Sequence, residues 1–334
     1  MNRIIIILLL LSALVGCKRN RLDIKVSDIK VNYEIHRFDR LLFAQQNFEA
    51  QSQLLQSYPQ HRDFIDLYTE KILRIGHVGM DSFEQELNRF VGDTVIAEVA
   101  DTVLQRFWDT DELEKWIDSG FRHYRYYFPE EAVPDIYTYV SGFNESLVVA
   151  ENFVGLSLDK YLGADCRFYE YLGIPRFKAL NMYPMKMVAD LFYGWALTEY
   201  PYSDSVDHLL SNMLYQGKLL YYTEAMLPDM PDSVLIGYTG KQLDWCDENE
   251  AAMWTYLVDQ KLIYNSDRLV LRKFMGDAPF TNAFGQDSPG RTGAWLGWQI
   301  VRSYMNKNEN VGLRELMTLH DAQRLLSASA YYPD

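Results

Sequence analysis

Asp190 is a residue whose surroundings indicate chemistry, because it interrupts an otherwise apolar run over residues 187–197. A carboxylate in such a helix must be hydrogen-bonded, or its pKa must rise. Tyr193 follows one helical turn later, so the two side chains lie close together. The functional interpretation is a pocket group. The alternative is a core aspartate bonded to a neighbouring hydroxyl or arginine, and the sequence leaves both open.

Arg291 is the second candidate, and it lies where a loop of small residues over 276–305 runs into a helix. Ser288 is expected to cap this helix, with Pro289 at its first position. A cation in the first turn opposes the helix dipole, so Arg291 needs an anionic partner. The loop N–H groups together with Arg291 could bind an anion.

The same helix carries a glycine face formed by Gly290, Gly293 and Gly297. Glycine on a helix face usually permits close packing, and the expected partner is the apolar helix 185–200. Arg291 would then pair at the rim with Asp190 or another carboxylate. An ion pair of this kind supports packing, whereas a guanidinium over an open groove supports a ligand.

Motifs for metal binding and nucleophilic catalysis are missing from the sequence. None of the six histidines has a second histidine four residues later, and no CxxC occurs. The G-x-S-x-G and P-loop patterns are also missing. Asp247, Glu248 and Glu250 leave open an all-oxygen calcium site beside the alternative of a solvated helix start. We therefore expect no catalytic residue, no metal and no cofactor.

The N-terminus predicts export and a lipid anchor. A short cationic start, an apolar run over residues 4–15 and the sequence Leu14-Val-Gly-Cys17 are typical of a lipoprotein signal peptide. Residues 1–16 are the expected signal peptide. Cys17 is the expected site of lipid attachment, for example of palmitate, and 17–28 a polar tether. The other two cysteines, Cys166 and Cys246, are left open as a disulfide or free thiols.

Composition limits the remaining possibilities. The formal net charge is −14, which argues against nucleic-acid binding. With 48% hydrophobic residues the chain can bury a sizeable core. No linker divides residues 29–334, so one domain is expected there. The membrane is an expected partner through the lipid at Cys17.

The elements that must position these residues are mostly helices. Alternation predicts a strand at 29–38, and two further strands at 136–140 and 146–158 are expected to form a small antiparallel sheet. Helices are predicted at 39–58 (ending at Pro59), 62–75, 83–90, 94–104, 109–128, 185–200, 206–226, 240–260, 267–275, the stretch after 288, and 309–326. The predicted class is therefore α+β, mostly helical with a small antiparallel sheet.

Several blocks of the sequence together resemble the gliding-motility lipoprotein GldB family of Bacteroidetes. They are the lipobox at Cys17, residues 162–175, residues 213–228, Gln242-Leu-Asp-Trp-Cys-Asp-Glu-Asn-Glu250 and Ser288-Pro-Gly-Arg-Thr-Gly-Ala-Trp-Leu-Gly-Trp-Gln-Ile-Val301. The resemblance implies a lipid-anchored envelope protein tied to gliding and to secretion-machinery partners. Because Cys17 is followed by Lys-Arg-Asn, the periplasmic face of the outer membrane is expected.

The order of sheet, central helix and later helix is also similar to zincin-like peptidases, including predicted zinc proteases with a Glu-Gly motif on the later helix. Here the helix 185–200 has no histidine, and the motif reads Gln216-Gly217, which removes metal ligands. This resemblance implies a degenerate peptidase scaffold whose cleft, with Gln216 added to the candidate pocket, binds without catalysis. The alternatives are an envelope hydrolase of peptide or glycan using carboxylates around Asp190 and Arg291, and a structural lipoprotein without a pocket.

Overall fold

The computed structural model describes residues 21–44, 50–203 and 206–333. The predicted signal peptide and Cys17 lie outside these ranges. The helices of the first half are α2 (Phe38–Phe43), α3 (Ala50–Leu67), the π-helix η1 (Tyr68–Ile72), α4 (Phe83–Gly92), α5 (Thr94–Arg106), α6 (Asp111–Tyr127), the 3-10 helix η2 (Leu158–Tyr161), α7 (Arg167–Tyr171) and α8 (Arg176–Ala179). Those of the second half are α9 (Pro184–Glu199), α10 (Leu209–Met226), α11 (Asp232–Ile236), α12 (Gly240–Asp259), α13 (Arg268–Met275), α14 (Thr292–Lys307), α15 (Leu313–Thr318) and α16 (Ala322–Ser329).

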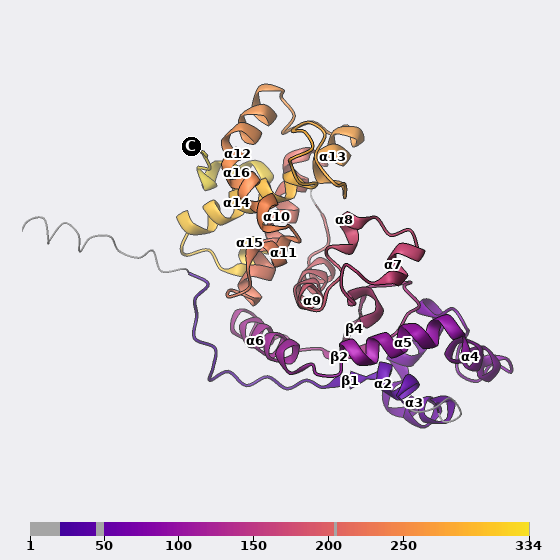
Figure 1. Cartoon of the computed structure of the whole chain (residues 1–334). Coiled ribbons are helices and arrows are strands. Elements are labelled where there is room, and N and C mark those ends of the chain that lie inside the picture. The colour runs from indigo at the N-terminus through magenta and orange to yellow at the C-terminus, as the bar shows by residue number, and fades with distance from the viewer. Residues whose placement is uncertain (1–20, 45–49, 204–205, 334) are drawn as a thin grey trace, which may run out of the picture.

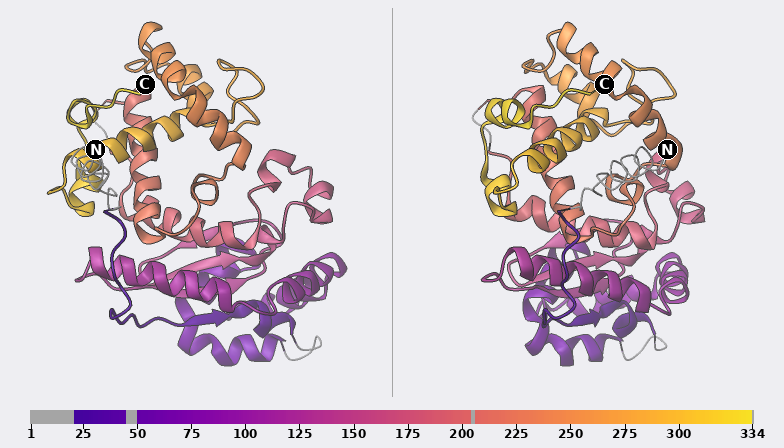
Figure 2. Two further views of the ribbon diagram at one scale, coloured as in Figure 1. Left: turned by 60° about the vertical axis from the view of Figure 1, so that its left-hand side comes forward. Right: turned by 90° about the vertical axis from the view of Figure 1, so that its left-hand side faces the viewer.

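A small mixed sheet separates two groups of helices (Figures 1 and 2). Its strands are β1 (Ile35–Arg37), β2 (Asp135–Tyr139), β3 (Leu147–Val149) and β4 (Phe153–Ser157), in the order β1-β2-β4-β3. The mostly helical α+β class is thus confirmed. The antiparallel arrangement holds only for β3 with β4, because β1–β2 and β2–β4 are parallel. The strand predicted at 146–158 is in fact a hairpin of β3 and β4.

Side-chain alternation along the strands divides the core in two. Tyr137, Tyr139 and Phe153 face α2, α3 and α4, whereas Ile136 and Val154 face the large core formed by α5, α6 and the helices from α9 onward. Helix α9 lies on that second side, against β3, β4, α6 and α10. The central position expected for this apolar helix is therefore confirmed, and it brings Asp190 to the border between sheet and helices.

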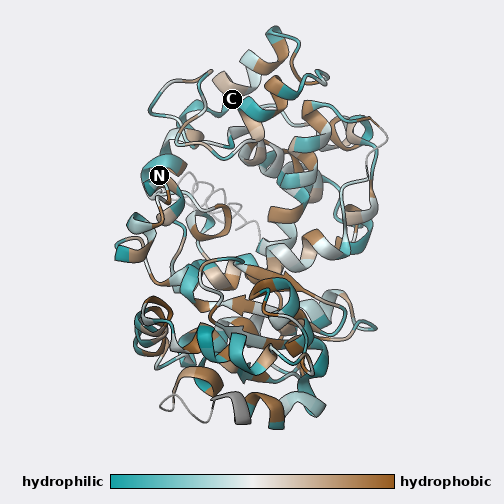
Figure 3. Ribbon diagram, turned by 90° about the vertical axis from the view of Figure 1, so that its right-hand side faces the viewer, coloured by the Kyte–Doolittle hydropathy of each residue, from teal (hydrophilic) through white to brown (hydrophobic). Residues whose placement is uncertain are grey.

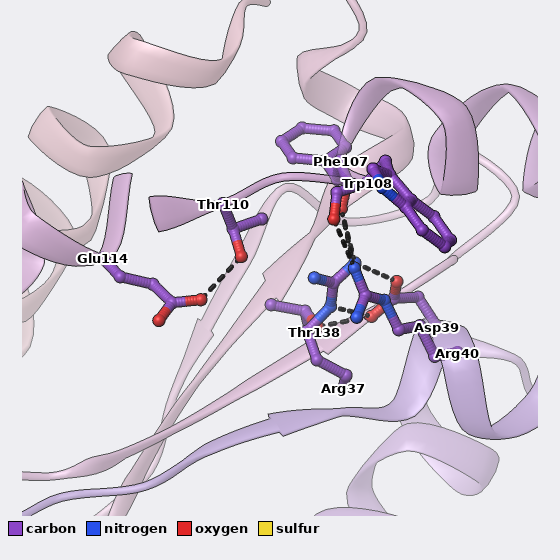
Figure 4. A network of polar contacts seen from close by, with 8 residues as sticks. All are labelled: Arg37, Asp39, Arg40, Phe107, Trp108, Thr110, Glu114 and Thr138. Atoms are coloured by element: carbon purple, nitrogen blue, oxygen red, sulfur yellow. Dashed lines mark hydrogen bonds and ion pairs between the residues drawn. The ribbon is translucent and has the colours of Figure 1, made fainter. Parts of the chain in front are cut away.

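A buried polar network joins β1 and α2 to β2 and to the end of α5 (Figure 4). The Arg37 guanidinium donates to both carboxylate oxygens of Asp39, at 2.9 and 2.7 Å, and to the Phe107 carbonyl at 3.1 Å. Thr138 on β2 donates its hydroxyl to the same Asp39, which is fully buried. Because each buried charge has a partner, this network fixes the β1–α2 corner without an orphan polar group.

Two helix boundaries differ from the predictions. Pro59 lies inside α3 instead of ending a helix, and the chain kinks at His61, where the backbone leaves helical angles. Proline removes one N–H donor and clashes with the preceding turn, which here bends the helix without ending it. Residues 45–49 of the helix predicted at 39–58 lie outside the described residues. The helix predicted at 309–326 is two short ones, α15 and α16, because residues 319–321 leave helical geometry.

Part of the segment interpreted as a tether is packed on the fold. Arg21 donates to the carbonyls of Met305 and Val311, and Leu22 is 3% exposed. Arg122 on α6 donates to the Ile29 carbonyl at 2.6 Å. Residues 21–28 thus follow the surface of the fold beside α6 and are not a free tether.

Most helices carry both hydrophobic and hydrophilic residues, as helices with one buried side do (Figure 3). Within the described ranges, no helix combines the length and the apolar character that a membrane crossing requires.

Candidate functional site

The glycine face of α14 packs on α10, not on α9 as predicted. An ideal Cβ on Gly217 of α10 would lie 2.3 Å from the carbonyl group of Gly297, and one on Gly297 would lie 1.8 Å from the Met213 oxygen. The two backbones are therefore in direct contact. Gly290 precedes the helix and instead lies against the Ala278 carbonyl, 2.1 Å from where its Cβ would be.

Helix α14 begins at Thr292, and Arg291 is its N-cap residue in the left-handed conformation, with φ 59° and ψ 29°. The prediction of Ser288 as cap and Pro289 as first helical residue is wrong, because the Ser288 hydroxyl is used inside the loop. It donates to the Gly285 carbonyl at 2.6 Å and accepts from the Thr281 N–H at 3.1 Å. Left-handed backbone is unfavourable for a residue with a Cβ, so Arg291 is held there by the loop.

The loop that holds Arg291 is itself bonded internally. The Thr281 hydroxyl donates to the Pro289 carbonyl at 2.8 Å and lies 3.0 Å from the Thr292 hydroxyl. The Tyr238 hydroxyl donates to the Gly290 carbonyl at 2.5 Å. These bonds lie on both sides of Arg291 in the sequence, so its backbone is held in place before any ligand arrives.

Asp190 and Arg291 line one pocket of about 570 Å³ between α8, α9 and the loop before α14. They do not contact each other. Lys186, one turn earlier on α9 and itself buried, forms an ion pair with Asp190. The Tyr161 hydroxyl donates to the other Asp190 oxygen at 3.0 Å. Asp190 is therefore a satisfied carboxylate, which agrees with the simpler of its two interpretations.

The other two candidates pair with each other. The Tyr193 hydroxyl on α9 donates to the Gln216 amide oxygen on α10 at 2.5 Å. Burial raises the pKa of Tyr193 above its ordinary value, so it is a neutral donor at physiological pH. Neither residue lines the pocket, and their bond ties α9 to α10 beside it. Of the four residues predicted to form one pocket, the structure thus places Asp190 and Arg291 in the lining, and Tyr193 and Gln216 between α9 and α10 outside it.

The Arg291 guanidinium is the group without a protein partner. It forms no hydrogen bond or ion pair with any described residue, although it lines the pocket. Burial lowers the pKa of Arg291, but the hydroxyls of Tyr193 and Tyr238 and the pocket carboxylates raise it above its ordinary value. The group is therefore always charged. Of the two outcomes considered for Arg291, the structure gives the open pocket and not the ion pair.

The lining of the pocket is cationic although the chain is acidic. Lys160, Lys178, Lys186 and Arg291 face two carboxylates, Asp190 and Asp277. Lys178 lies 3.7 Å from Asp277, and Lys160 donates to the Phe143 carbonyl at 3.3 Å. Sequence reasoning missed Lys186, Tyr161, Lys160 and Asp277. The four-residue spacing of Lys186 and Asp190 could have revealed the first of these.

The carboxylates of α12 and the two cysteines are the other residues considered for chemistry. In the described part of the chain no three His, Cys, Asp or Glu side chains are grouped to hold an ion. On α12, Glu250 accepts a hydrogen bond from Tyr331 at 2.6 Å. Cys166 and Cys246 are free thiols, which answers the question left open above. Burial raises the pKa of the Cys246 thiol well above its ordinary value, so it is not a thiolate.

The fold and the pocket define the class: a mostly helical α+β protein with a preorganised cationic pocket. The chain belongs to the gliding motility protein GldB family, whose model matches residues 19–333. Membership indicates a gliding-motility lipoprotein at the cell envelope. Comparisons with curated proteins and with solved structures find no match.

Proposed function

We propose that this protein is a lipid-anchored component of the gliding and secretion apparatus of the envelope, and that it acts by binding a partner and not by catalysis. The observation that carries this proposal is the Arg291 guanidinium. The loop holds the backbone of Arg291, its guanidinium forms no hydrogen bond or ion pair with any described residue, and it lines a pocket with an excess of basic side chains. Arg291 is only partly exposed, and a charge withdrawn from water is costly unless it is paired, so its partner is expected to come from outside the chain.

We further propose that the anchor is lipid on Cys17 and that it holds the protein on the periplasmic face of the outer membrane. Four residue steps separate Cys17 from Arg21 and span at most about 14 Å. Since Arg21 is bound to the carbonyls of Met305 and Val311, the surface beside α15 would lie next to the bilayer. The described chain begins beside α15, and α8 lies on the opposite side of the molecule (Figures 1 and 2). The pocket would therefore open away from this point of attachment.

The peptidase-like ancestry remains part of the proposal. Ser146, directly before β3, lines the pocket next to α9, so a pocket beside the sheet exists where the resemblance expects a cleft. The polar ends of Tyr193 and Gln216 are bonded to each other, as in a scaffold that no longer needs them for an ion. A hydrolase using Asp190 has no supporting observation, because Lys186 and Tyr161 already occupy that carboxylate.

Recovery of the protein from its own envelope tests this role. Full-length protein with a C-terminal tag is cross-linked in cells, and co-purified proteins are quantified for wild type and three variants. Arg291→Gln removes the pocket charge, and Arg268→Gln removes an equal charge from an exposed position on α13. Cys17→Ala removes the expected lipid site and is also followed by palmitate labelling and membrane fractionation.

We expect one or more envelope proteins to be recovered with wild type and Arg268→Gln, and at least about tenfold less with Arg291→Gln, as for a lost charged contact. Cys17→Ala should lose both the label and the membrane association. An unchanged set of partners in Arg291→Gln would contradict the binding role of the pocket. Palmitate on the Cys17→Ala protein would contradict the anchor.

A further inference from the structure

Two compartments meet at Arg291. The pocket of about 570 Å³ beside α9 is adjoined by a second one of about 240 Å³ between α8, α11 and the loop before α14. Both are lined by Phe177, Asn181, Asp277 and Arg291. A group bound to the guanidinium therefore has room to extend in two directions, and the combined space is of the size that small ligands or short peptide ends occupy.

The charges around Arg291 favour an anionic ligand. Lys186 is neutralised by Asp190, and Lys178 lies within ion-pair distance of Asp277. The remaining cations are Arg291 and Lys160, and the latter already donates to a carbonyl. Lys160 keeps its charge, so the four cations of the lining exceed the two carboxylates by two, but only Arg291 has no bonded partner among the described residues. A carboxylate matches the planar fork of arginine and carries one charge.

The other residues that line the two compartments are of the kinds that bind a peptide. The larger compartment combines Ile174, Phe177 and Ile236 with the amide of Asn181. The smaller one is lined by Leu180, Tyr183, Tyr238 and Pro279 and also by Asn181, Thr239 and Gln242, so it offers both apolar contacts and hydrogen-bonding groups. Exposed apolar side chains continue the surface at the mouth: Tyr171 is 76% exposed and Leu172 is 54% exposed. Exposed apolar groups around a charged pocket are typical of a protein-binding surface.

Building on the proposed binding role, we propose that this pocket recognises the C-terminal residue of a partner protein. A C-terminal residue branches at its Cα into a carboxylate, a side chain and the preceding chain. The carboxylate would bind Arg291, the apolar side chain would enter the smaller compartment, and the chain would leave through the larger one. An internal aspartate or glutamate has chain on both sides of its Cα, so main chain would have to occupy both compartments.

The test uses full-length protein in detergent and two peptide libraries. Both are random octapeptides with a fluorescent N-terminal label; one has a free C-terminal carboxylate and the other a C-terminal amide. Peptides selected from the first library are resynthesised in both forms, and binding is measured by fluorescence anisotropy. Arg291→Gln is compared with the matched surface variant Arg268→Gln. Ala278→Leu, which narrows the smaller compartment, reports on the terminal side chain.

We expect selected peptides to end in an apolar residue. Amidation should weaken binding at least about tenfold, Arg291→Gln should do the same, and Arg268→Gln should have no effect, because a charge-assisted hydrogen bond is lost only in the first two cases. Ala278→Leu should shift selection to smaller terminal residues. Acetate should compete better than inorganic phosphate.

The inference is overturned if amidated peptides bind equally well, if phosphate is the stronger competitor, or if neither library yields a peptide that depends on Arg291. Selection of internal acidic residues with no effect of amidation would assign the carboxylate to a side chain and also overturn it. If the libraries fail while envelope recovery still depends on Arg291, only the C-terminal recognition is wrong. If recovery also shows no dependence, the proposed binding role is wrong.

Discussion

Replacing Gly297 with alanine is expected to lower the free energy of unfolding by about 3 kcal/mol or more. The new Cβ would lie 1.8 Å from the Met213 oxygen and 2.4 Å from its carbonyl carbon. Those atoms belong to the backbone of α10, so no flexible side chain can move away. The helices must separate, and Trp295, Trp298 and Leu296 of α14, all buried, would lose contact with their neighbours.

Gly240→Ala is the matched control. Gly240 is the first residue of α12, its Cβ would meet no atom within 4 Å, and its φ is not positive. Alanine there should change stability by less than about 1 kcal/mol, in the stabilising direction, because alanine is the better helix former. Urea unfolding followed by circular dichroism compares the two variants with wild type. Equal small effects would mean that α10 and α14 are not in backbone contact.

Arg302→Met is the second substitution with a large expected effect. It should lower the free energy of unfolding by about 3 kcal/mol. The Arg302 guanidinium donates to Glu224 at 2.9 Å and to both oxygens of Asp232, at 2.7 and 2.8 Å. Its carbon lies 3.8 Å from the centre of the Trp298 ring. Glu224 on α10 has a side chain that is 13% exposed, so removal of Arg302 leaves a buried carboxylate without its cation.

This loss is expected to depend on pH. Burial raises the pKa of Glu224 above its ordinary value, and Arg302 opposes that rise. In the variant the folded-state pKa rises further, so the folded protein binds the proton more tightly than the unfolded chain. Stability from such a group is present below the unfolded-state pKa and is lost as the pH rises through the folded-state pKa. Arg302→Met should therefore be more destabilised at pH 8 than at pH 5.

Urea unfolding at these two pH values measures the difference. Arg89→Met is the control, because Arg89 pairs with Glu86 on the surface of α4 and is 69% exposed. Exposed pairs contribute less than about 1 kcal/mol. A loss for Arg302→Met that is the same at both pH values would show that Glu224 is already solvated in the variant.

Local signals in the sequence predicted the helices that carry the site. The apolar run over 185–200 gave α9, the bounds of α10 were predicted within a few residues, and the acidic first turn of α6 marked its start. The sheet was harder, because the pairing of β1 with β2 joins residues about a hundred positions apart and no local pattern records it. The prediction that a helix ends at Pro59 was wrong for a related reason: tertiary packing keeps α3 together across its kink.

The site was predictable in its residues and not in its geometry. Asp190 stood out by its apolar surroundings, and its partner Lys186 was readable from the helical spacing. The glycine face of α14 correctly predicted a contact between two helix backbones. Only the structure shows that the contact is with Gly217 of α10. The left-handed backbone of Arg291 had no sequence signal, because glycine is the residue expected at such a position. A strained residue of this kind is often kept for function.

The most direct test of the central claim, that Arg291 serves a ligand and not the fold, is the unfolding free energy of Arg291→Gly and Arg291→Ala. Both remove the guanidinium, and both should lose the wild-type binding of carboxylate-terminated peptides. Glycine also relieves the backbone at φ 59°. The Arg291→Gly protein should be about 1 kcal/mol more stable than the Arg291→Ala protein and at least as stable as wild type. If both variants are clearly less stable than wild type, Arg291 holds the fold together and the account is wrong.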